Sequence, residues 1–383
     1  MSWQEVISNE VLDIRDGTHD SPKYIKTGYP LITSKNLKQG IIDFSDVNLI
    51  SEEDYIEINK RSRVNKGDIL YSMIGSIGNY ALVNEEPDYA IKNVALFKFI
   101  DHRLYNKYFL HLINSFVIER QIQKAIKGGT QKFVSLKILR NLKIPLPPLD
   151  QQKKIADILD AADAYRQKTK ALIEKYDELT QSLFLDMFGD PVSNPKKLPV
   201  KSLGELCEFY SGRAWKKAEL GSHGYKLVRI SNLHKQSFPY WLYEGEMIEK
   251  HKVEDGDLLF SWAGVQASID AYIYKGETAM INQHIYNIKP RNEMSKLFLY
   301  NLLQLHLDNL RGSLGGGVGQ FHLKKTDVTG IKVILPNEVT MNKYLSSLAS
   351  LNKQKAQAQA SLAQAEDLFN SLLQRAFKGE LTA

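Results

Sequence analysis

The sequence contains one long internal repeat, which restricts the fold to two copies of a single structural unit. The segment VNKGDILYS, which begins at Val64, matches VEDGDLLFS, which begins at Val253, so the residue numbers differ by 253 − 64 = 189. The same displacement relates six pairs of identical residues: Gly75 and Gly264, Asn93 and Asn282, Gln131 and Gln320, Pro147 and Pro336, Ser182 and Ser371, and Phe188 and Phe377. Upstream, PLITSKNL ending at Leu37 matches KLVRISNL ending at Leu233, where the displacement is 233 − 37 = 196. A register without net gaps between Val64 and Phe188 predicts a globular part followed by a long helix, used twice.

The first long helix is predicted over 150–188. Pro147 and Pro148 end an extended segment, and Asp150 follows at a position suited to an N-cap. Apolar residues then recur at alternating steps of three and four, as in the seam of a coiled coil: Ile155, Ile158, Ala162, Tyr165, Thr169, Leu172, Tyr176, Leu179 and Leu183. Leu159, Ile173 and Phe184 widen the stripe. Gly189, with Pro191 just beyond it, predicts the end of the helix.

A second long helix, predicted over 337–378, is the expected partner of the first. Its apolar residues keep the same alternation, with Lys355 as a charged interruption: Tyr344, Leu348, Leu351, Ala358, Leu362, Ala365, Phe369 and Leu372. Asn337 can cap its start. A helix of this length needs a partner for its apolar face, so we expect the two helices to pair in antiparallel fashion.

The globular parts mix strand and helix signals. Segments such as DILYSMIG alternate like strands, whereas LYNKYFLHLINSFVIERQIQKAI has helical spacing and precedes Gly128. The predicted fold class is therefore mixed α+β. Two α/β domains, 1–149 and 190–336, form a pseudo-twofold tandem repeat and are joined by the two long helices as an antiparallel coiled coil.

The composition excludes several classes of protein. A single cysteine, Cys207, excludes an intrachain disulfide framework and a zinc site built from several cysteines. The chain lacks the glycine-rich phosphate loop G-x-x-x-x-G-K-[ST], the zinc motif H-E-x-x-H and the N-P-P-[YF] tetrad of amino-methyltransferases. No apolar run has membrane-spanning length and no secretion signal is recognised, so we expect a cytoplasmic protein. The net charge of +6 permits a nucleic-acid partner.

Polar and aromatic residues lie in matching loops of the two copies but differ in identity, which suggests two readers of different sequences. Arginine and lysine can neutralise phosphates and grip guanine, and asparagine and glutamine can bond adenine edges. The segment from Ser115 to Leu149 also holds seven lysines or arginines and one acid. The predicted DNA-binding residues of the first copy are Thr18, His19, Lys23, Lys35, Asn36, Arg61, Arg63 and Lys132. Those of the second copy are Arg213, Trp215, Lys216, Arg229, Ser231, Asn232, Gln266, Gln283, His284 and Gln320.

The order of these segments resembles the specificity subunit of type I restriction-modification systems. The resemblance covers essentially the whole chain, and its most specific pieces are IPLPPLDQQ, GDILYS, GDLLF, DGTHDSP and the terminal RAFKGEL. The second helix entry departs from the family pattern, because ILPNEVTMNKY replaces the proline-rich form.

The resemblance implies a noncatalytic subunit in which 1–149 and 190–336 are target recognition domains. Each domain would read one half of a split, asymmetric site in double-stranded DNA. The helices 150–188 and 337–378 would be spacers that also dock two methyltransferase subunits, with restriction subunits added for cleavage. S-adenosylmethionine, ATP and Mg would be bound by those partner subunits, so we expect no catalytic residue, metal or cofactor in this chain.

Two other functions fit parts of the pattern. One is a structural adaptor, a coiled-coil protein whose end domains bind proteins. The unlike loops in equivalent domains favour DNA, since an adaptor that grips identical partners gains nothing from different loops. The other is a self-contained modification enzyme, which the missing methyl-transfer tetrad disfavours.

Overall fold

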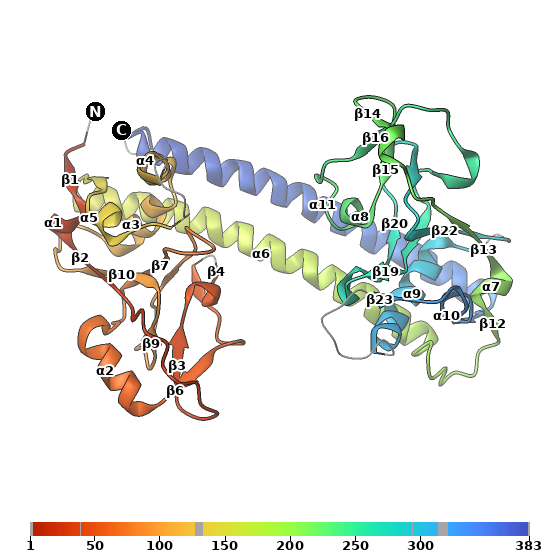
Figure 1. Cartoon of the computed structure of the whole chain (residues 1–383), viewed down its shortest axis with the longest axis horizontal. Helices are drawn as coiled ribbons and strands as arrows, with labels where there is room; N and C mark the ends of the chain where they lie inside the picture. The colour runs from red at the N-terminus through yellow and green to blue at the C-terminus, as the bar shows by residue number, and fades with distance from the viewer. Residues whose placement is uncertain (1–2, 39, 127–132, 293, 313–320, 382–383) are drawn as a thin grey trace. The chain divides into compact units, whose positions relative to one another are not determined.

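The computed structural model describes residues 3–38, 40–126, 133–292, 294–312 and 321–381 and divides into two compact units (Figure 1). Unit 1 comprises Met1–Lys170 with Gln359–Ala383, and unit 2 comprises Ala171–Ala358. The long helices α6 (Leu149–Phe188) and α11 (Glu338–Phe377) each contribute residues to both units. The fold class is mixed α and β with tandem domains, as predicted.

Unit 1 is built on a mainly antiparallel set of strands. One sheet has the order β2 (Leu12–Asp16), β10 (Val94–Phe99), β7 (Ile69–Ser72) and β8 (Tyr80–Leu82). A second has the order β6 (Asn48–Ile50), β3 (Tyr29–Ile32) and β9 (Ala90–Ile91), and in it β3 and β9 are parallel. Two short pairs are β1 (Glu5–Ile7) with β11 (Lys143–Pro145) and β4 (Leu37–Lys38) with β5 (Ile41–Ile42).

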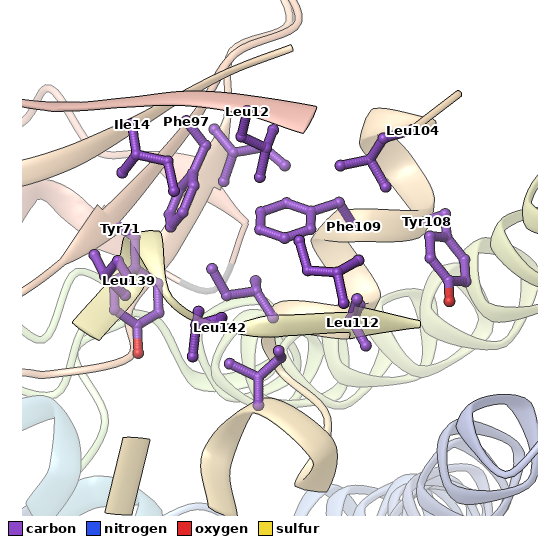
Figure 2. Close-up of a cluster of buried hydrophobic side chains, with 14 of the residues drawn as sticks. Leu12, Ile14, Tyr71, Phe97, Leu104, Tyr108, Phe109, Leu112, Leu139 and Leu142 are labelled. Atoms are coloured by element: carbon purple, nitrogen blue, oxygen red, sulfur yellow. The ribbon is translucent and has the colours of Figure 1, made fainter. Parts of the chain in front are cut away.

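Most helices of unit 1 pack in the core on one face of the first sheet. They are α1 (Ser8–Val11), α3 (Asn106–Ile113), α4 (Phe116–Ile126) and α5 (Leu136–Arg140). Helix α2 (Glu52–Ser62) packs instead on the second sheet, and a 3-10 turn occurs at Ser34–Asn36. Figure 2 shows the core between the first sheet and these helices. In it, Phe97 of β10 lies beside Phe109 of α3, with 5.1 Å between the ring centroids. Ile155 and Leu159 of α6 belong to the same core, so the long helix is part of the unit.

Unit 2 repeats this arrangement. Its first sheet has the order β13 (Cys207–Ser211), β22 (Ile285–Pro290), β18 (Leu258–Ser261) and β20 (Asp270–Ile273). Its second has the order β14 (Leu220–Gly221), β16 (Trp241–Tyr243), β15 (Tyr225–Val228), β21 (Ala279–Ile281) and β17 (Lys252–Val253), with β15 and β21 parallel. The short pairs are β12 (Val200–Ser202) with β24 (Lys332–Ile334) and β19 (Ala263–Gly264) with β23 (Phe321–His322). The α-helices of its globular part are α7 (Leu203–Leu206), α8 (Ile230–His234), α9 (Lys296–Gly312) and α10 (Lys325–Thr329), and 3-10 turns occur at Lys217–Glu219, Glu249–His251 and Gln266–Ser268.

The central strands are apolar on both faces because each lies between two cores. In β7, Ile69 and Tyr71 point into the core that contains the helices, whereas Leu70 points into a smaller core on the other face. In β18, Leu258 and Phe260 face the larger core of unit 2 and Leu259 faces the smaller one. Alternate side chains of a strand lie on opposite faces, so a strand buried on both sides reads as the continuous apolar run DILYS or DLLFS.

The constant displacement of the repeat is broken locally. Ser72 and Ser261 occupy equivalent places in β7 and β18, at the predicted displacement. Ser72 pairs with Val94 and Ser261 pairs with Ile285. The displacement between the two partners is 285 − 94 = 191, two more than the 261 − 72 = 189 of the serines. The predicted displacement returns between β11 and β24, so the prediction of no net gap holds although the equivalence of Asn93 with Asn282 is displaced within its turn.

The starts of the two long helices differ. Helix α6 begins at Leu149, and the Pro148 carbonyl accepts from the amides of Gln151 and Gln152. The prediction of Asp150 as N-cap was therefore wrong by position, since Asp150 lies inside the first turn, where its charge still complements the helix dipole. In α11 the Asn337 side-chain oxygen accepts from the Thr340 amide at 2.9 Å, so that cap is confirmed. Gly189 ends α6 with φ 79°, a conformation that favours glycine.

Within each unit the segments of α6 and α11 pack against one another in antiparallel fashion. In unit 1 the Lys170 ammonium pairs with Glu366, and the Arg166 guanidinium lies 4.4 Å above the ring of Phe369. In unit 2 the Phe188 ring packs at 5.0 Å from that of Tyr344, and Lys355 pairs with Asp177. Lys355 therefore has a partner across the seam.

One part of the predicted seam was wrong. Ile158, Tyr165, Leu172 and Leu179 are 37–54% exposed. The buried or half-buried series in α6 instead advances from Ile155 by four and then three residues: Ile155, Leu159, Ala162, Arg166, Thr169 and Ile173. The residues three places after Ile155, Ala162 and Thr169 are Ile158, Tyr165 and Leu172, whereas the residues four places after them are Leu159, Arg166 and Ile173, so the sequence pattern favours the predicted seam. The stacking of Arg166 on Phe369 favours the observed one.

Candidate nucleic-acid interface

The loop after β2 is held close to the β9–β10 turn by a glycine. A Cβ atom added at Gly17 would lie 2.3 Å from the carbonyl oxygen of Ile91, so the loop requires a residue without a side chain. The Gly17 amide donates to Val94 O and the Thr18 amide donates to Ile91 O, each at 3.0 Å. These bonds fix where the following residues project.

A buried carboxylate organises the charged residues of this loop. Asp16 accepts from His19 Nε2 at 2.8 Å through one oxygen and from the Arg61 guanidinium through the other. His19 Nδ1 bonds the side-chain oxygen of Asn93 at 2.9 Å, and Asn93 has φ 55°, a left-handed conformation that asparagine tolerates. The hydrogen bonds to Asn93 and Asp16 raise the pKa of His19. Asp16 thus holds the mostly exposed His19 ring and Arg61 guanidinium on the same carboxylate.

The other predicted residues of unit 1 differ in how exposed their side chains are. Lys23, Lys35 and Arg63 are exposed, and Lys35 pairs with Asp46 at 3.0 Å. Thr18 is half-buried and its hydroxyl accepts from the Asp20 amide. Asn36 is 2% exposed, and its amide bonds Thr33, Asp43 O and Asp46 O at 3.0 Å, so in this structure it holds its loop instead of offering free groups. Lys132 lies outside the described residues.

Unit 2 holds the equivalent loop in the same frame with different residues. A Cβ at Gly212 would lie 2.2 Å from the carbonyl oxygen of Asn282, and the Gly212 amide donates to Ile285 O. The Arg213 guanidinium lies 4.2 Å above the Trp215 ring and pairs with Glu219. Trp215 is buried, and its indole donates to Ile281 O at 3.2 Å.

A second cationic group of unit 2 is also stacked on an aromatic ring. The Arg229 guanidinium lies 4.2 Å above the Trp241 ring and donates to Pro239 O, and burial lowers its pKa. Asn232 is 2% exposed and its amide bonds Arg229 N and Phe238 O, so it repeats the structural role of Asn36. Ser231 lies in α8 beside it and is half-buried.

The remaining predicted residues of unit 2 lie on other loops. Lys216 and Gln266 are exposed, and the Gln266 amide donates to Arg311 O at 2.9 Å. Gln283 and His284 are adjacent in the turn between β21 and β22, and burial lowers the pKa of His284. Gln320 lies outside the described residues.

Several residues of these clusters were absent from the predicted set. Asp16, Asn93, Trp262 and Asn282 each contact a predicted residue or complete its loop. The pairing of Asn93 with Asn282 in the repeat was a usable signal for two of them. For Asp16 and Trp262 only the contacts in the fold reveal the role.

A catalytic or metal centre finds no support in the described residues. They contain no group of three or more His, Cys, Asp or Glu side chains placed to hold a metal ion. The Cys207 thiol is buried, which raises its pKa to about 11. None of the described helices combines the length and apolar content that a bilayer crossing requires.

The family model of the type I restriction modification DNA specificity domain matches residues 2–176 and 195–362. The chain belongs to this family. Among curated proteins, it is 24% identical to the putative type I restriction enzyme MjaX specificity subunit of Methanocaldococcus jannaschii, over 97% of this chain and 92% of that protein. It is 23% identical to the EcoKI specificity subunit of Escherichia coli K12, over 94% of this chain and 84% of that protein.

The fold agrees with this assignment. The solved S subunit of a type I restriction-modification system from M. genitalium superposes with a TM-score of 0.57 at 16% identity, covering 98% of this chain and 96% of that one. The chain is therefore a specificity subunit, a DNA-recognition component and not the part of such a system that performs methylation or cleavage.

Proposed function

We propose that this specificity subunit recognises a bipartite, asymmetric DNA site and docks methyltransferase and restriction subunits. Residues 1–149 and 190–336 act as target recognition domains, one for each half of the site. The observation that carries the proposal is that Gly17 and Gly212 fix equivalent loops in equivalent frames, whereas the side chains on those loops differ. Two identical readers would keep the same side chains, so the difference favours two unlike half-sites.

The two loops also suggest different modes of contact. In unit 1, His19 and Arg61 share the buried Asp16 carboxylate and remain mostly exposed, which suits contacts with phosphate oxygens. In unit 2, Arg213 and Arg229 are flattened on Trp215 and Trp241, which limits their motion and suits planar contacts with bases. Phosphate contacts position a protein on DNA and base contacts specify the sequence.

The long helices supply a surface for protein partners. Ile158, Tyr165, Leu172 and Leu179 recur every seven residues on α6 and are exposed, which is unusual for large apolar side chains outside an interface. The positions that the repeat makes equivalent on α11 are Ser347, Gln354, Ser361 and Leu368, so three of the four are polar. We assign the apolar stripe of α6 to the docking of a methyltransferase subunit, and the residues 150–188 and 337–378 to a spacer that fixes the unread base pairs.

The chemistry of modification and cleavage belongs to the partners in this proposal. Two methyltransferase subunits would bind S-adenosylmethionine, and restriction subunits would use ATP and Mg. A second solved chain matches 99% of this chain at 18% identity and a TM-score of 0.55. It is described as the structural basis underlying complex assembly and conformational transition of the type I R-M system. The full-length match in fold supports the same kind of assembly here.

Domain replacement tests the proposal. A host carrying this chain and its partner subunits is sequenced for methylated motifs, before and after residues 1–149 are exchanged for the corresponding domain of a relative. One half of the motif should change and the other half should stay. A simultaneous change of both halves would contradict the assignment of one half-site to each domain, and methyl transfer by the purified chain alone would contradict its noncatalytic role.

A further inference from the structure

Four polar atoms without hydrogen-bond partners belong to two neighbouring segments of unit 2, the residue after β18 and the turn between β21 and β22. They are Trp262 Nε1, Asn282 Oδ1, Gln283 Oε1 and His284 Nδ1, all shielded from solvent although their side chains are only half-buried. Trp262 and His284 are in contact, since their ring centroids lie 5.3 Å apart and the Trp262 amide donates to His284 O. A buried polar group without a partner lowers stability, so four in one place require an explanation.

The hydrogen bond between Gln283 and His284 determines what the pair offers to a ligand. Gln283 Nε2 donates to His284 Nε2 at 3.2 Å, which leaves the proton of a neutral imidazole on Nδ1. Burial lowers the pKa of His284, which favours the neutral ring. Once the half-buried side chains turn toward a ligand, the pair offers one acceptor, Gln283 Oε1, and one donor, His284 Nδ1–H. Rotating the amide and moving the ring proton would exchange the two roles and still leave one donor and one acceptor.

Unit 1 has no such open set at the equivalent turn. Between Ile91 and Val94 lie two residues, Lys92 and Asn93, whereas three residues lie between Ile281 and Ile285. The Asn93 oxygen is bonded to His19, and Lys92 donates to the Ser21 hydroxyl at 2.6 Å. The open set is therefore a property of unit 2 and comes with its longer turn.

We propose that Trp262, Gln283 and His284 form a base-reading centre that takes the major-groove edge of an adenine in the half-site of unit 2. Adenine presents the N7 acceptor and the N6 amino donor on one edge, and the neighbouring residues Gln283 and His284 offer one acceptor and one donor to meet them. A phosphate fits poorly, because the Gln283–His284 pair keeps one acceptor in either orientation, and that acceptor would face a phosphate oxygen. Trp262 supplies a second donor and a rigid ring that holds His284 in place. This inference rests on the proposed function, because it presumes that unit 2 reads DNA.

Point variants provide the first test. The methylated motif is determined for the wild-type chain with its partners and then for Gln283→Leu and Trp262→Phe, the latter of which keeps an aromatic ring and removes the N–H. Both variants should relax or change the same adenine position of the methylated motif. That position should lie in the half of the motif that stays unchanged when residues 1–149 are replaced. Gln151→Leu is the matched control, since Gln151 also has a buried, unpartnered side-chain oxygen but lies on α6 in unit 1. Its motif should be unchanged.

Base analogues test the same contact with the protein intact. Duplexes carry the wild-type site with 7-deazaadenine at one adenine at a time, which removes the N7 acceptor. Binding by the assembled complex should fall about 5- to 150-fold at one position of the unit 2 half-site. In Gln283→Leu the same analogue should have little further effect, because the paired contact is already lost.

The outcomes separate this inference from the function on which it rests. A wild-type complex that methylates no bipartite motif would overturn the proposed function. A normal wild-type motif that persists in both variants, a uniform loss of affinity at all positions, or an effect confined to a cytosine would overturn the adenine-reading centre and leave the proposed function standing.

Discussion

Replacing Gly17 by alanine should displace the first recognition loop and leave the second intact. The new Cβ would lie 2.3 Å from Ile91 O, 2.5 Å from Ile91 C and 2.7 Å from Lys92 N, all backbone atoms that cannot rotate away. Ordinary contact begins near 3.4 Å, so the loop and the turn must separate by about 3.4 − 2.3 = 1.1 Å.

That separation removes two hydrogen bonds. The bonds from Gly17 N to Val94 O and from Thr18 N to Ile91 O, each 3.0 Å, would lengthen to about 4 Å and cease to be hydrogen bonds. At about 0.5–1.5 kcal/mol each, the free energy of unfolding should fall by about 1–3 kcal/mol. For a unit of this size the unfolding midpoint should then fall by about 2–12 °C.

The assay combines calorimetry with methylome sequencing. Gly17→Ala should weaken recognition of the half-site read by unit 1, and Gly212→Ala, whose Cβ would lie 2.2 Å from Asn282 O, should weaken the other half. Gly312→Ala is the control, because a Cβ there meets no atom of the described residues within 4 Å at the end of α9. If Gly17→Ala unfolds within about 0.5 kcal/mol of wild type and keeps the full motif, the reasoning from close approach is refuted.

Three further predictions concern the loop, the helix stripe and the helix entry. The pKa of His19 in the folded protein is raised above 6.5, so its contribution to stability is present below that pH and lost as pH rises through the raised value. The free energy of unfolding, measured by chemical denaturation from about pH 5.5 to 8.5, should fall accordingly, and His19→Gln should remove this pH dependence. Tyr165→Lys with Leu172→Lys should weaken methyltransferase-subunit binding about tenfold or more in a titration while thermal unfolding hardly changes, and Gln354→Lys on α11 should change neither; undiminished binding would exclude the stripe as the docking surface. Gln152→Leu should cost about 2–5 kcal/mol of stability in denaturant unfolding, because the buried amide bonds Tyr105 N, Arg103 O and Pro147 O, whereas Gln151→Leu should cost less than about 1 kcal/mol; equal costs would argue against that network.

The large elements were predictable because their signals are local. The repeat, the end of α6 at Gly189 and the cap at Asn337 follow from residue identity and spacing alone. The choice of seam on α6 was not predictable from the sequence, because the charged Arg166 interrupts the apolar series that the structure buries. Packing on α11 decides between the two, and Arg166, a charged residue, takes a place in the contact through Phe369.

The candidate DNA-binding residues stay a prediction, and the sequence indicates their loops better than the exposure of their side chains. Lys35 and Asn36 are neighbours of similar polarity, yet one is exposed and the other is saturated by bonds to its own loop. Burial of that kind depends on how the loop closes, which composition does not encode. The centre around Trp262 depends in addition on a turn that is one residue longer in unit 2, a difference hidden by the compensated displacement of the repeat.

The two cores on either side of each central sheet have a consequence for how new specificities arise. In unit 1 the smaller core, which contains Ile32, Leu37 and Val64, supports recognition loops, whereas the larger one contains Ile155 and Leu159 of the long helix. Substitutions that remodel the smaller core are separated from the helix by the sheet. Evolution can therefore exchange one target sequence for another by local repacking, without selecting compensating changes in the helix surface that we propose docks the partner subunits. An engineer can restrict a mutational library in the same way.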